Sequence, residues 1–377
     1  MKSVYLDNAA TTPLIPEVVD AMKEALLNSF GNPSSSHQIG RKSKALLESA
    51  RKNIASHFNV TSKEIIFTSS GTEANNLILH NAVHNYGVKR MITSRIEHHA
   101  VLHPCEHYEQ QGLIQLDYVK VKKAGQIDLE HLEELLASSN EKTLVSLMMI
   151  NNEIGNILPV KQVSQCCQRY QALFHSDTVQ VIGHYPLDLQ DVPIDFIAAS
   201  AHKFHGPKGV GFAYFKNGFT VKPMLFGGDQ EKGARSSTEN IPGIVGLDKA
   251  LTMALENIDD DHEYVAELKG YFLKELKKIS PEIQFNGQSA DLKQSSYTIL
   301  NVRFPVKNTM FLFQLDMKGV AVSTGSACQS GASKVSHVLH EFLDDEQRQL
   351  TSLRFSFSKF TTKEQIDFTL EKIKELL

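Results

Sequence analysis

The stretch DFIAASAHKFHGPKG, Asp195–Gly209, joins an apolar run to a polar loop that carries a lysine. The run Phe196–Ala199 predicts a strand covered on both faces, and Ser200, His202 and Lys203 follow it. Lysine is rarely buried without a partner or a chemical role. A desolvated lysine amine loses its proton more readily, and the neutral amine can attack an aldehyde to form a Schiff base. A lysine at a strand end is more often an ordinary loop residue, so the surrounding sequence has to decide between the two.

Strand and helix patterns alternate around this stretch, from Glu64 to about Phe215. The segments with strand character are Glu64–Thr68, Arg90–Thr93, Ile114–Val121, Leu144–Ile150, Leu173–Ser176, Phe196–Ala199 and Gly211–Phe215. Helical patterns lie between them, for example at Glu73–Asn85 and Leu129–Leu136. This alternation predicts an α/β fold with a mostly parallel sheet covered on both faces.

The pattern changes after Ile241, where a long helical stretch runs to Ile279 with an interruption near Asp259–Asp261. Shorter strands and helices follow it, at Ser296–Val302, Thr309–Lys318, Val320–Ser323, Leu353–Ser358 and Lys363–Leu377. We therefore predict two closely packed domains. The large domain covers residues 15–250, and a smaller α+β domain is made of residues 1–14 and 251–377.

The composition narrows the class of protein. Hydrophobic residues make up 41% and charged residues 22% of the 377 residues, as in ordinary soluble globular proteins. The net charge of −4 gives no electrostatic reason to expect nucleic acid or an anionic membrane as a partner. The chain has no apolar run of about 18 residues, and its first residues lack a signal-peptide pattern. We expect a cytoplasmic protein whose cysteines, which show no CxxC spacing, are reduced thiols.

A histidine-rich segment, EHHAVLHPCEH, suggests a metal site at first sight. It places His99, His103 and His107 at i, i+4 and i+8, on one face of a helix. However, no HExxH pattern or ligand carboxylate completes the set, and Pro104 disturbs a helix there. We therefore expect no metal site.

Asp177 and Gln180 follow another strand, Leu173–Ser176, and complement Lys203. A carboxylate at a strand end suits the pyridine nitrogen of pyridoxal-5′-phosphate (PLP), because the protonated ring is a better electron sink. Gln180 can hydrogen-bond the phenolic oxygen of the same ring. Taken alone, this aspartate would be an ordinary cap.

The segment TSSGTEANN, Thr68–Asn76, follows a strand and opens a helix. The backbone amides of Gly71 and Thr72 would face outward at the helix N-terminus, where the dipole favours a phosphate. The segment is neither the dinucleotide pattern GxGxxG nor a P-loop, and such turns are common caps. By itself it is a weak phosphate motif.

A series of motifs occurs in the order typical of the cysteine desulfurases, and the chain resembles this family from Tyr5 to beyond Thr362. The motifs are DNAATT (Asp7–Thr12), GNPSSSH (Gly31–His37), SSGTEANN (Ser69–Asn76), EHHAVL (Glu97–Leu102), NNEIG (Asn151–Gly155), HKFHGPKG (His202–Gly209), RSSTEN (Arg235–Asn240), GSAC (Gly325–Cys328) and LRFSFSKFTT (Leu353–Thr362). These enzymes belong to the class-V aminotransferase superfamily of PLP enzymes. The resemblance therefore implies PLP fold type I, the aspartate-aminotransferase-like fold, and a homodimer with shared active sites.

The resemblance also implies a role for each site residue. Lys203 would form the Schiff base with PLP and remove the substrate α-proton, and the His98 imidazole would stack on the cofactor ring. Arg354 would hold the α-carboxylate of the substrate L-cysteine, with Asn152 beside it and Asn32 at the substrate entrance. The cofactor-binding residues that the resemblance implies are Gly71, Thr72, His98, Asn152, Asp177, Gln180, Ser200, His202, Lys203 and, from the neighbouring subunit, Thr238.

Cys328 lies in the run GSACQSGAS, whose small residues cannot build a packed core and predict an exposed loop. Cys105, Cys166 and Cys167 sit in helical patterns beside apolar neighbours, and we interpret them as structural. The resemblance implies that the Cys328 thiolate takes sulfur from L-cysteine as a persulfide, leaving L-alanine. An acceptor protein for iron–sulfur assembly or tRNA thiolation would then receive the sulfur.

Two alternatives stay open from the sequence. A selenocysteine lyase or another class-V PLP enzyme would use the same scaffold, although a transaminase needs no nucleophilic Cys328. A non-catalytic assembly scaffold would be expected to lack Lys203, Asp177 or Arg354, and all three are present. The chain also departs from the family pattern at Asp229, Ser237 and Val335, where Gly, Gly and Pro are usual. These departures leave the sulfur acceptor and the turnover rate undetermined.

Overall fold

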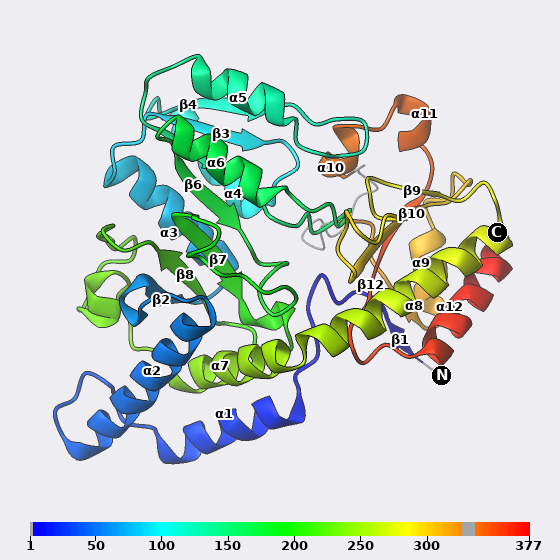
Figure 1. Cartoon of the computed structure of the whole chain (residues 1–377). Coiled ribbons are helices and arrows are strands. Elements are labelled where there is room, and N and C mark those ends of the chain that lie inside the picture. The colour runs from blue at the N-terminus through cyan, green and yellow to red at the C-terminus, as the bar shows by residue number, and fades with distance from the viewer. Residues whose placement is uncertain (1–2, 326–335) are drawn as a thin grey trace.

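A computed structural model describes residues 3–325 and 336–377 and places a seven-stranded sheet in the larger part of the molecule, between helices (Figure 1). The strand order is β2-β8-β7-β6-β5-β3-β4. The strands are β2 Ile65–Thr68, β3 Arg90–Ser94, β4 Gln115–Val119, β5 Thr143–Ser146, β6 Leu173–Asp177, β7 Phe196–Ser200 and β8 Gly211–Phe215. Strand β8 pairs antiparallel with β2 and β7, while the other neighbouring pairs are parallel. The prediction of a mostly parallel sheet is confirmed.

Helices cover both faces of this sheet, and successive side chains of a strand pack on opposite faces. In β7, Phe196 and Ala198 pack in an apolar cluster with residues of α3 (Gly71–His84) and α4 (His99–Gln110). Ile197 and Ala199 pack in the cluster on the opposite face. The helices of that face are α1 Pro16–Asn28, α2 Gln38–His57, α5 Leu129–Ala137, α6 Val160–Arg169 and α7 Ile241–Glu256. Burial on both faces explains why this strand reads as a continuous apolar run.

A smaller α+β part contains an apolar cluster of its own. Its strands β9 (Gln284–Phe285), β10 (Ile299–Arg303) and β12 (Ser352–Ser356) form an antiparallel sheet. Strand β1 (Val4–Tyr5) pairs in parallel with β11 (Val320–Ala321), so the start of the chain packs in this part (Figure 1). The helices here are α8 Ile258–Ile279, α9 Phe311–Met317, α11 Asp345–Arg348 and α12 Lys363–Leu376. Helix α10, His337–His340, packs in a separate small cluster with Ile96 and Ile154.

The long helical stretch predicted after Ile241 is interrupted at Asn257. Helices α7 and α8 lie on either side of this residue and extend from the large sheet to the smaller part (Figure 1). The acidic run Asp259–Asp261 forms the first turn of α8, where the helix dipole favours negative charge. The interruption therefore precedes the acidic run by two residues, and the run itself marks the start of a new helix.

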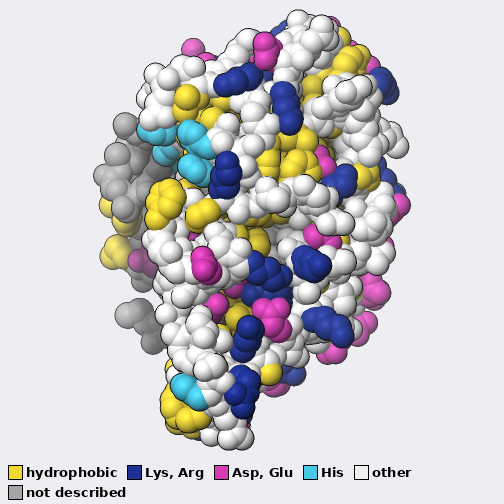
Figure 2. Space-filling view, turned by 90° about the vertical axis from the view of Figure 1, so that its left-hand side faces the viewer, with side chains coloured by type: hydrophobic (Ala, Val, Ile, Leu, Met, Phe, Trp, Pro, Cys, Tyr) yellow, Lys and Arg dark blue, Asp and Glu magenta, His cyan; other side chains and the backbone are white. Residues whose placement is uncertain are grey.

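The helices, surface charges and cysteines of the described residues are those of an ordinary globular protein. No helix within residues 3–325 and 336–377 is long and apolar enough to cross a membrane. Lysine and arginine side chains are intermixed with aspartate and glutamate on the face shown in Figure 2. Cys105, Cys166 and Cys167 are free and buried, as the sequence predicted.

Gly211, the first residue of β8, lets the start of α3 approach the sheet. A Cβ on Gly211 would lie 2.3 Å from the carbonyl oxygen of Ala199 and 2.9 Å from the carbonyl carbon of Ser70. Because both are backbone atoms, we expect Gly211→Ala to lower the free energy of unfolding by about 1–3 kcal/mol, measured by urea unfolding.

A matched control is Gly270→Ala within α8, where a Cβ would meet only Leu292 Cδ1, at 3.6 Å. This change should raise the free energy of unfolding by about 0.5–1 kcal/mol, because alanine favours a helix interior. A Gly211→Ala protein as stable as the unchanged chain would contradict the close approach.

Candidate active site

A cavity of about 200 Å³ lies where the carboxyl ends of β5, β6 and β7 meet the start of α3. The carboxyl edge of a parallel sheet is where α/β proteins usually bind ligands. The predicted residues that line it are Gly71, Thr72, His98, Asn152, Asp177, Gln180, Ser200, His202, Lys203 and Arg354. Sequence reasoning did not single out its other lining residues, Ala9, Ala10, Ser70, Asn75, Ala100, Met148, Ile150 and Val179.

Lys203 enters the cavity from the short 3₁₀ turn Ala201–Lys203 that follows β7. Its Nζ donates hydrogen bonds to the carbonyl oxygens of Ala9 and Ala10, at 2.7 and 2.8 Å. The N-terminal segment therefore lies against the lysine amine. Nothing in the local sequence of Lys203 points to this contact, which joins residues almost two hundred positions apart.

Asp177 ends β6 and is buried in the cavity wall. Its Oδ1 accepts the backbone N–H of Val179 at 3.0 Å, and its Oδ2 accepts the side-chain N–H of Asn75 at 2.7 Å. Gln180 donates through Nε2 to the carbonyl oxygen of Ala9 at 3.0 Å. Because each oxygen of Asp177 accepts an N–H group, the geometry suits a carboxylate.

The start of α3 forms a polar cradle beside Ser200. Ser70 is the N-cap, and Gly71 and Thr72 open the helix, so their N–H groups have no acceptor within it. A Cβ on Gly71 would lie 2.6 Å from Val179 Cγ2. Ser200 Oγ is buried and has no hydrogen-bond partner in the described part of the chain. A buried hydroxyl without a partner next to a helix N-terminus indicates a place for an anion.

Two half-buried histidines in the cavity wall are neutral because their surroundings disfavour the charged ring. His98 is the N-cap of α4, where its Nδ1 accepts the backbone N–H of Ala100 at 3.1 Å. Burial lowers the pKa of His98, and the charge of Asp177 opposes this only in part. Burial, helped by the charge of Lys203, lowers the pKa of His202 to about 4. Both rings can therefore accept or donate hydrogen bonds as neutral groups near pH 7.

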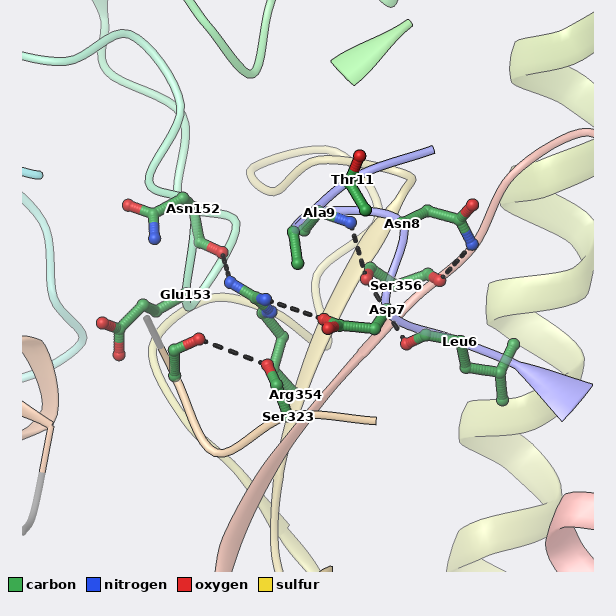
Figure 3. Close-up of polar contacts among 12 residues, drawn as sticks. Leu6, Asp7, Asn8, Ala9, Thr11, Asn152, Glu153, Ser323, Arg354 and Ser356 are labelled. Atoms are coloured by element: carbon green, nitrogen blue, oxygen red, sulfur yellow. Dashed lines mark hydrogen bonds and ion pairs between the residues drawn. The ribbon is translucent and has the colours of Figure 1, made fainter. Parts of the chain in front are cut away.

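Arg354 reaches the cavity from β12, on the smaller part (Figure 3). Its guanidinium donates to Asp7 Oδ1 at 2.8 Å and to the carbonyl oxygen of Asn152 at 2.8 Å. Its Nε is buried without a partner among the described residues. Sequence reasoning identified Arg354 but not Asp7, although Asp7 begins the motif DNAATT.

Two predicted site residues among those described, Asn32 and Thr238, do not line the cavity. Asn32 is exposed, and its Oδ1 accepts the backbone N–H of Ser34 at 2.9 Å. Thr238 is also exposed, in a loop that Arg235 ties to Glu73 of α3 with a 2.8 Å ion pair. Cys328, like Val335, lies in 326–335, outside the described residues.

Glu153 is buried between the two described residues that flank 326–335. The hydroxyl of Ser336 donates to its Oε2. The same oxygen lies 2.7 Å from where a Cβ of Gly325 would stand. The backbone of Arg354 exchanges hydrogen bonds with Ser323, at 2.7 and 3.3 Å. Gly325 and Ser336 therefore lie close together, near the arginine of the cavity.

The histidine-rich segment forms part of α4. The rings of His99 and His103 lie 4.7 Å apart between centroids, and His337 lies 4.5 Å from His99. Across the described ranges, no group of three or more His, Cys, Asp or Glu is arranged to hold a metal ion.

Comparisons with known proteins place the chain in a family. The model of the aminotransferase class-V family matches residues 4–368. "Cysteine desulfurase IscS" of Dictyoglomus turgidum is 40% identical over 100% of this chain and 95% of that protein. The chain belongs to the cysteine desulfurase family of class-V aminotransferases. The resemblance read from the motifs is confirmed.

Solved structures extend the comparison to the fold. A NifS-like protein superposes with a TM-score of 0.91 at 34% identity, over 100% of this chain and 99% of that one. The structure described as SspA in complex with cysteine has a TM-score of 0.82 at 29% identity, over 96% of this chain and 100% of that one. The predicted fold class, an α/β fold of PLP type I with a smaller α+β part, is confirmed.

Class-V aminotransferases depend on PLP, and the residues of the cavity fit this cofactor. The unpartnered Ser200 hydroxyl and the start of α3 suit its phosphate. Asp177 suits a protonated ring nitrogen, and Lys203 suits its aldehyde. The donor set therefore has a group for each polar end of PLP.

Asp7→Ala should destabilise the protein, because it leaves the Arg354 guanidinium buried without its carboxylate partner. The side chain of Arg354 is only 1% exposed. Breaking such a pair from one side costs about 3 kcal/mol, which guanidinium chloride unfolding would measure.

The pair Arg348–Asp345, whose carboxylate lies at the surface, is the matched control. Asp345 is 94% exposed and lies 2.9 Å from Arg348. Asp345→Ala should therefore change the free energy of unfolding by less than about 0.5 kcal/mol. Equal effects of the two substitutions would show that the Asp7–Arg354 pair contributes no more than a surface pair.

Proposed function

We propose that the chain, a cysteine desulfurase by its family, holds PLP in this cavity and converts L-cysteine to L-alanine. The observation that carries the proposal is the convergence of Lys203, Asp177 and Arg354 on one cavity from separate parts of the chain. These are the groups needed for the cofactor aldehyde, the ring nitrogen and a substrate carboxylate. The structural neighbour SspA was solved with cysteine, which agrees with this substrate.

The cofactor's phosphate would be held by the N–H groups of Gly71 and Thr72 and by the side chains of Ser200 and His202.

The cofactor's ring would be held by four other residues of the cavity. Asp177 would pair with the ring nitrogen, and His98 would lie against the ring. Gln180 and Asn152 would lie near its hydroxyl. When bound, PLP supplies an electron sink that stabilises negative charge at the substrate α-carbon.

Arg354 would bind the substrate α-carboxylate with the guanidinium N–H groups that Asp7 and Asn152 leave available. The Asp7 and Asn152 contacts hold the guanidinium plane still, so the carboxylate meets a preorganised donor. Lys203 Nζ removes the α-proton and later returns a proton. Asn32 would contribute at the entrance.

Sulfur transfer is assigned to Cys328. Its thiolate attacks the sulfur of the bound cysteine, the substrate carbon–sulfur bond breaks, and the β-carbon takes up a proton as alanine forms. The persulfide sulfur then passes to a thiol of an acceptor protein, in iron–sulfur assembly or in tRNA thiolation.

We propose that the enzyme is a cytoplasmic homodimer. Thr238 is exposed and does not line the cavity of its own chain, which agrees with a role in the partner's site. The free, buried cysteines agree with a reducing compartment. We also propose the division into a large domain, residues 15–250, and a small domain, residues 1–14 and 251–377, because the apolar cluster of the smaller part is separate from the two clusters of the large sheet, one of which has its last buried residue close to this boundary, at Leu251.

Lys203→Ala should abolish the covalent link to PLP, although the phosphate cradle at α3 should still bind the cofactor. Borohydride reduction of the unchanged enzyme followed by peptide mapping should mark Lys203, and the variant should carry no mark. Reduction that labels another lysine and leaves Lys203 unmarked would end the proposal.

Cys328→Ser should separate the two halves of the reaction. A hydroxyl is far less acidic than a thiol and cannot carry the transferred sulfur, so persulfide formation should be lost. The variant should still bind L-cysteine and exchange its α-proton with heavy water, because Lys203, Asp177 and Arg354 are unchanged. It should release no alanine in step with sulfur.

Mass spectrometry of the α-deuterated cysteine and assays of alanine and sulfide would measure both halves together. Cys105→Ser, at a buried thiol of α4, is a control that should keep the full reaction. Substantial desulfuration by Cys328→Ser would instead indicate a direct lyase.

A further inference from the structure

A chain of buried hydrogen bonds runs behind Asp177, away from the cavity. Asn75 donates from Nδ2 to Asp177 Oδ2 at 2.7 Å. The Asn75 Oδ1 lies 3.0 Å from His175 Nε2, and His175 Nδ1 lies 2.8 Å from the hydroxyl of Ser146. All four residues are buried. Asn75 and Asp177 line the cavity, whereas His175 and Ser146 lie one step deeper.

The direction of each hydrogen bond follows from the first. An ionised Asp177 has only acceptors, so Asn75 must turn its NH₂ group toward it and its carbonyl oxygen toward His175. His175 Nε2 must then carry the proton, because a carbonyl oxygen only accepts. His175 Nδ1 is left as an acceptor, and the Ser146 hydroxyl donates to it. Every donor in this series of four hydrogen-bonded residues meets an acceptor when Asp177 is a carboxylate and His175 is the neutral Nε2–H form.

The opposite state requires every group in this series to reorient. A protonated Asp177 with its hydroxyl toward Asn75 would need the Asn75 amide to flip, and the flipped NH₂ group would meet the His175 Nε2–H until that proton moved to Nδ1. The Asn75 orientation in the structure therefore matches an Asp177 carboxylate together with the Nε2–H form of His175. Unmatched polar groups in a buried site are costly. Burial also lowers the pKa of His175 to about 3, so the ring stays neutral at working pH.

We propose that His175 is a positioning residue which, through Asn75, holds Asp177 as a carboxylate aimed into the cavity. This role rests on the proposed function, since it concerns the partner of the PLP ring nitrogen. Loss of the His175 donor frees the Asn75 amide to turn and weakens the hold on the carboxylate. The cofactor then binds less tightly, and its ring nitrogen holds its proton less firmly.

Three variants test this role on the apoprotein reloaded with PLP. His175→Leu removes the donor, and His175→Gln replaces it with an amide N–H of similar reach. Ser176→Ala is the matched control. The Ser176 hydroxyl is also buried in β6, but it donates to the carbonyl oxygen of Leu147 and takes no part in the hydrogen bonds that join Ser146 to Asp177. The readouts are the PLP dissociation constant of the apoprotein, the ¹⁵N shift of ring-labelled PLP, and thermal unfolding without cofactor.

We expect His175→Leu to bind PLP about tenfold more weakly, the lower end of the loss seen when a residue that orients a metal ligand is removed. Its ring ¹⁵N signal should move toward that of an unprotonated nitrogen. His175→Gln should recover most of both properties. Ser176→Ala should match the unchanged protein in both, even if its thermal unfolding temperature falls.

Unchanged PLP binding and an unchanged ¹⁵N signal in His175→Leu would overturn the proposal, as would equal losses in His175→Gln. If His175→Leu does not fold, Ser146→Ala decides, because it removes only the hydroxyl that fixes the ring. It should shift both readouts in the same direction by less, and no shift would overturn the proposal. Failure of the unchanged apoprotein to bind PLP would instead refute the proposed function.

Discussion

The arrangement of the candidate site depends on the hydrogen bonds of the N-terminal segment, which crosses from one apolar core to the other. Leu6 and Ala9 bond to Ser356 of β12, in the smaller part. Thr12 bonds through its backbone N–H to the carbonyl oxygen of His202, at 2.9 Å, beside the large sheet. Between these anchors, Asp7 holds Arg354 and the carbonyl oxygens of Ala9 and Ala10 hold Lys203. One short segment thus sets the separation between the lysine and the arginine.

The large sheet supplies the other half of the geometry. Strands β6 and β7 are parallel neighbours, so Asp177 and Ser200 end at the same edge, and the start of α3 lies against that edge. Gly71 and Gly211 permit the approach, because a Cβ at either would collide with neighbouring atoms. The polar groups therefore lie together at the carboxyl edge of the sheet, where loops and the N-terminus of α3 can hydrogen-bond with them.

Local patterns in the sequence suggested part of this site, and the resemblance to the desulfurases was needed to choose among their ordinary interpretations. The apolar run before Lys203, the strand before Asp177 and the turn at Gly71 each leave a signal within a few residues, and the structure places all three residues at the cavity. The pairing of Asp7 with Arg354 leaves no such signal, since it joins opposite ends of the chain. The same holds for the hydrogen bonds that join Ser146 to Asp177 through His175 and Asn75. In the local sequence His175 is only one polar residue in a buried strand. Long-range polar contacts require the register of several elements at once, which no local pattern contains.

The surroundings of the cavity also determine which groups carry charge. Burial raises the pKa of Glu97 to about 8, and the charge of Asp177 acts in the same direction, although Ser94 and the Met148 N–H donate to the carboxyl group. At neutral pH Glu97 is therefore mostly protonated and adds little negative charge beside Asp177. With the half-buried His98 and His202 neutral, the positive charge available to an anionic ligand comes from Lys203, Arg354 and the start of α3. That distribution of charge matches three groups: a phosphate at α3, a protonated ring nitrogen near Asp177 and a carboxylate near Arg354. PLP and an amino acid together supply these three groups.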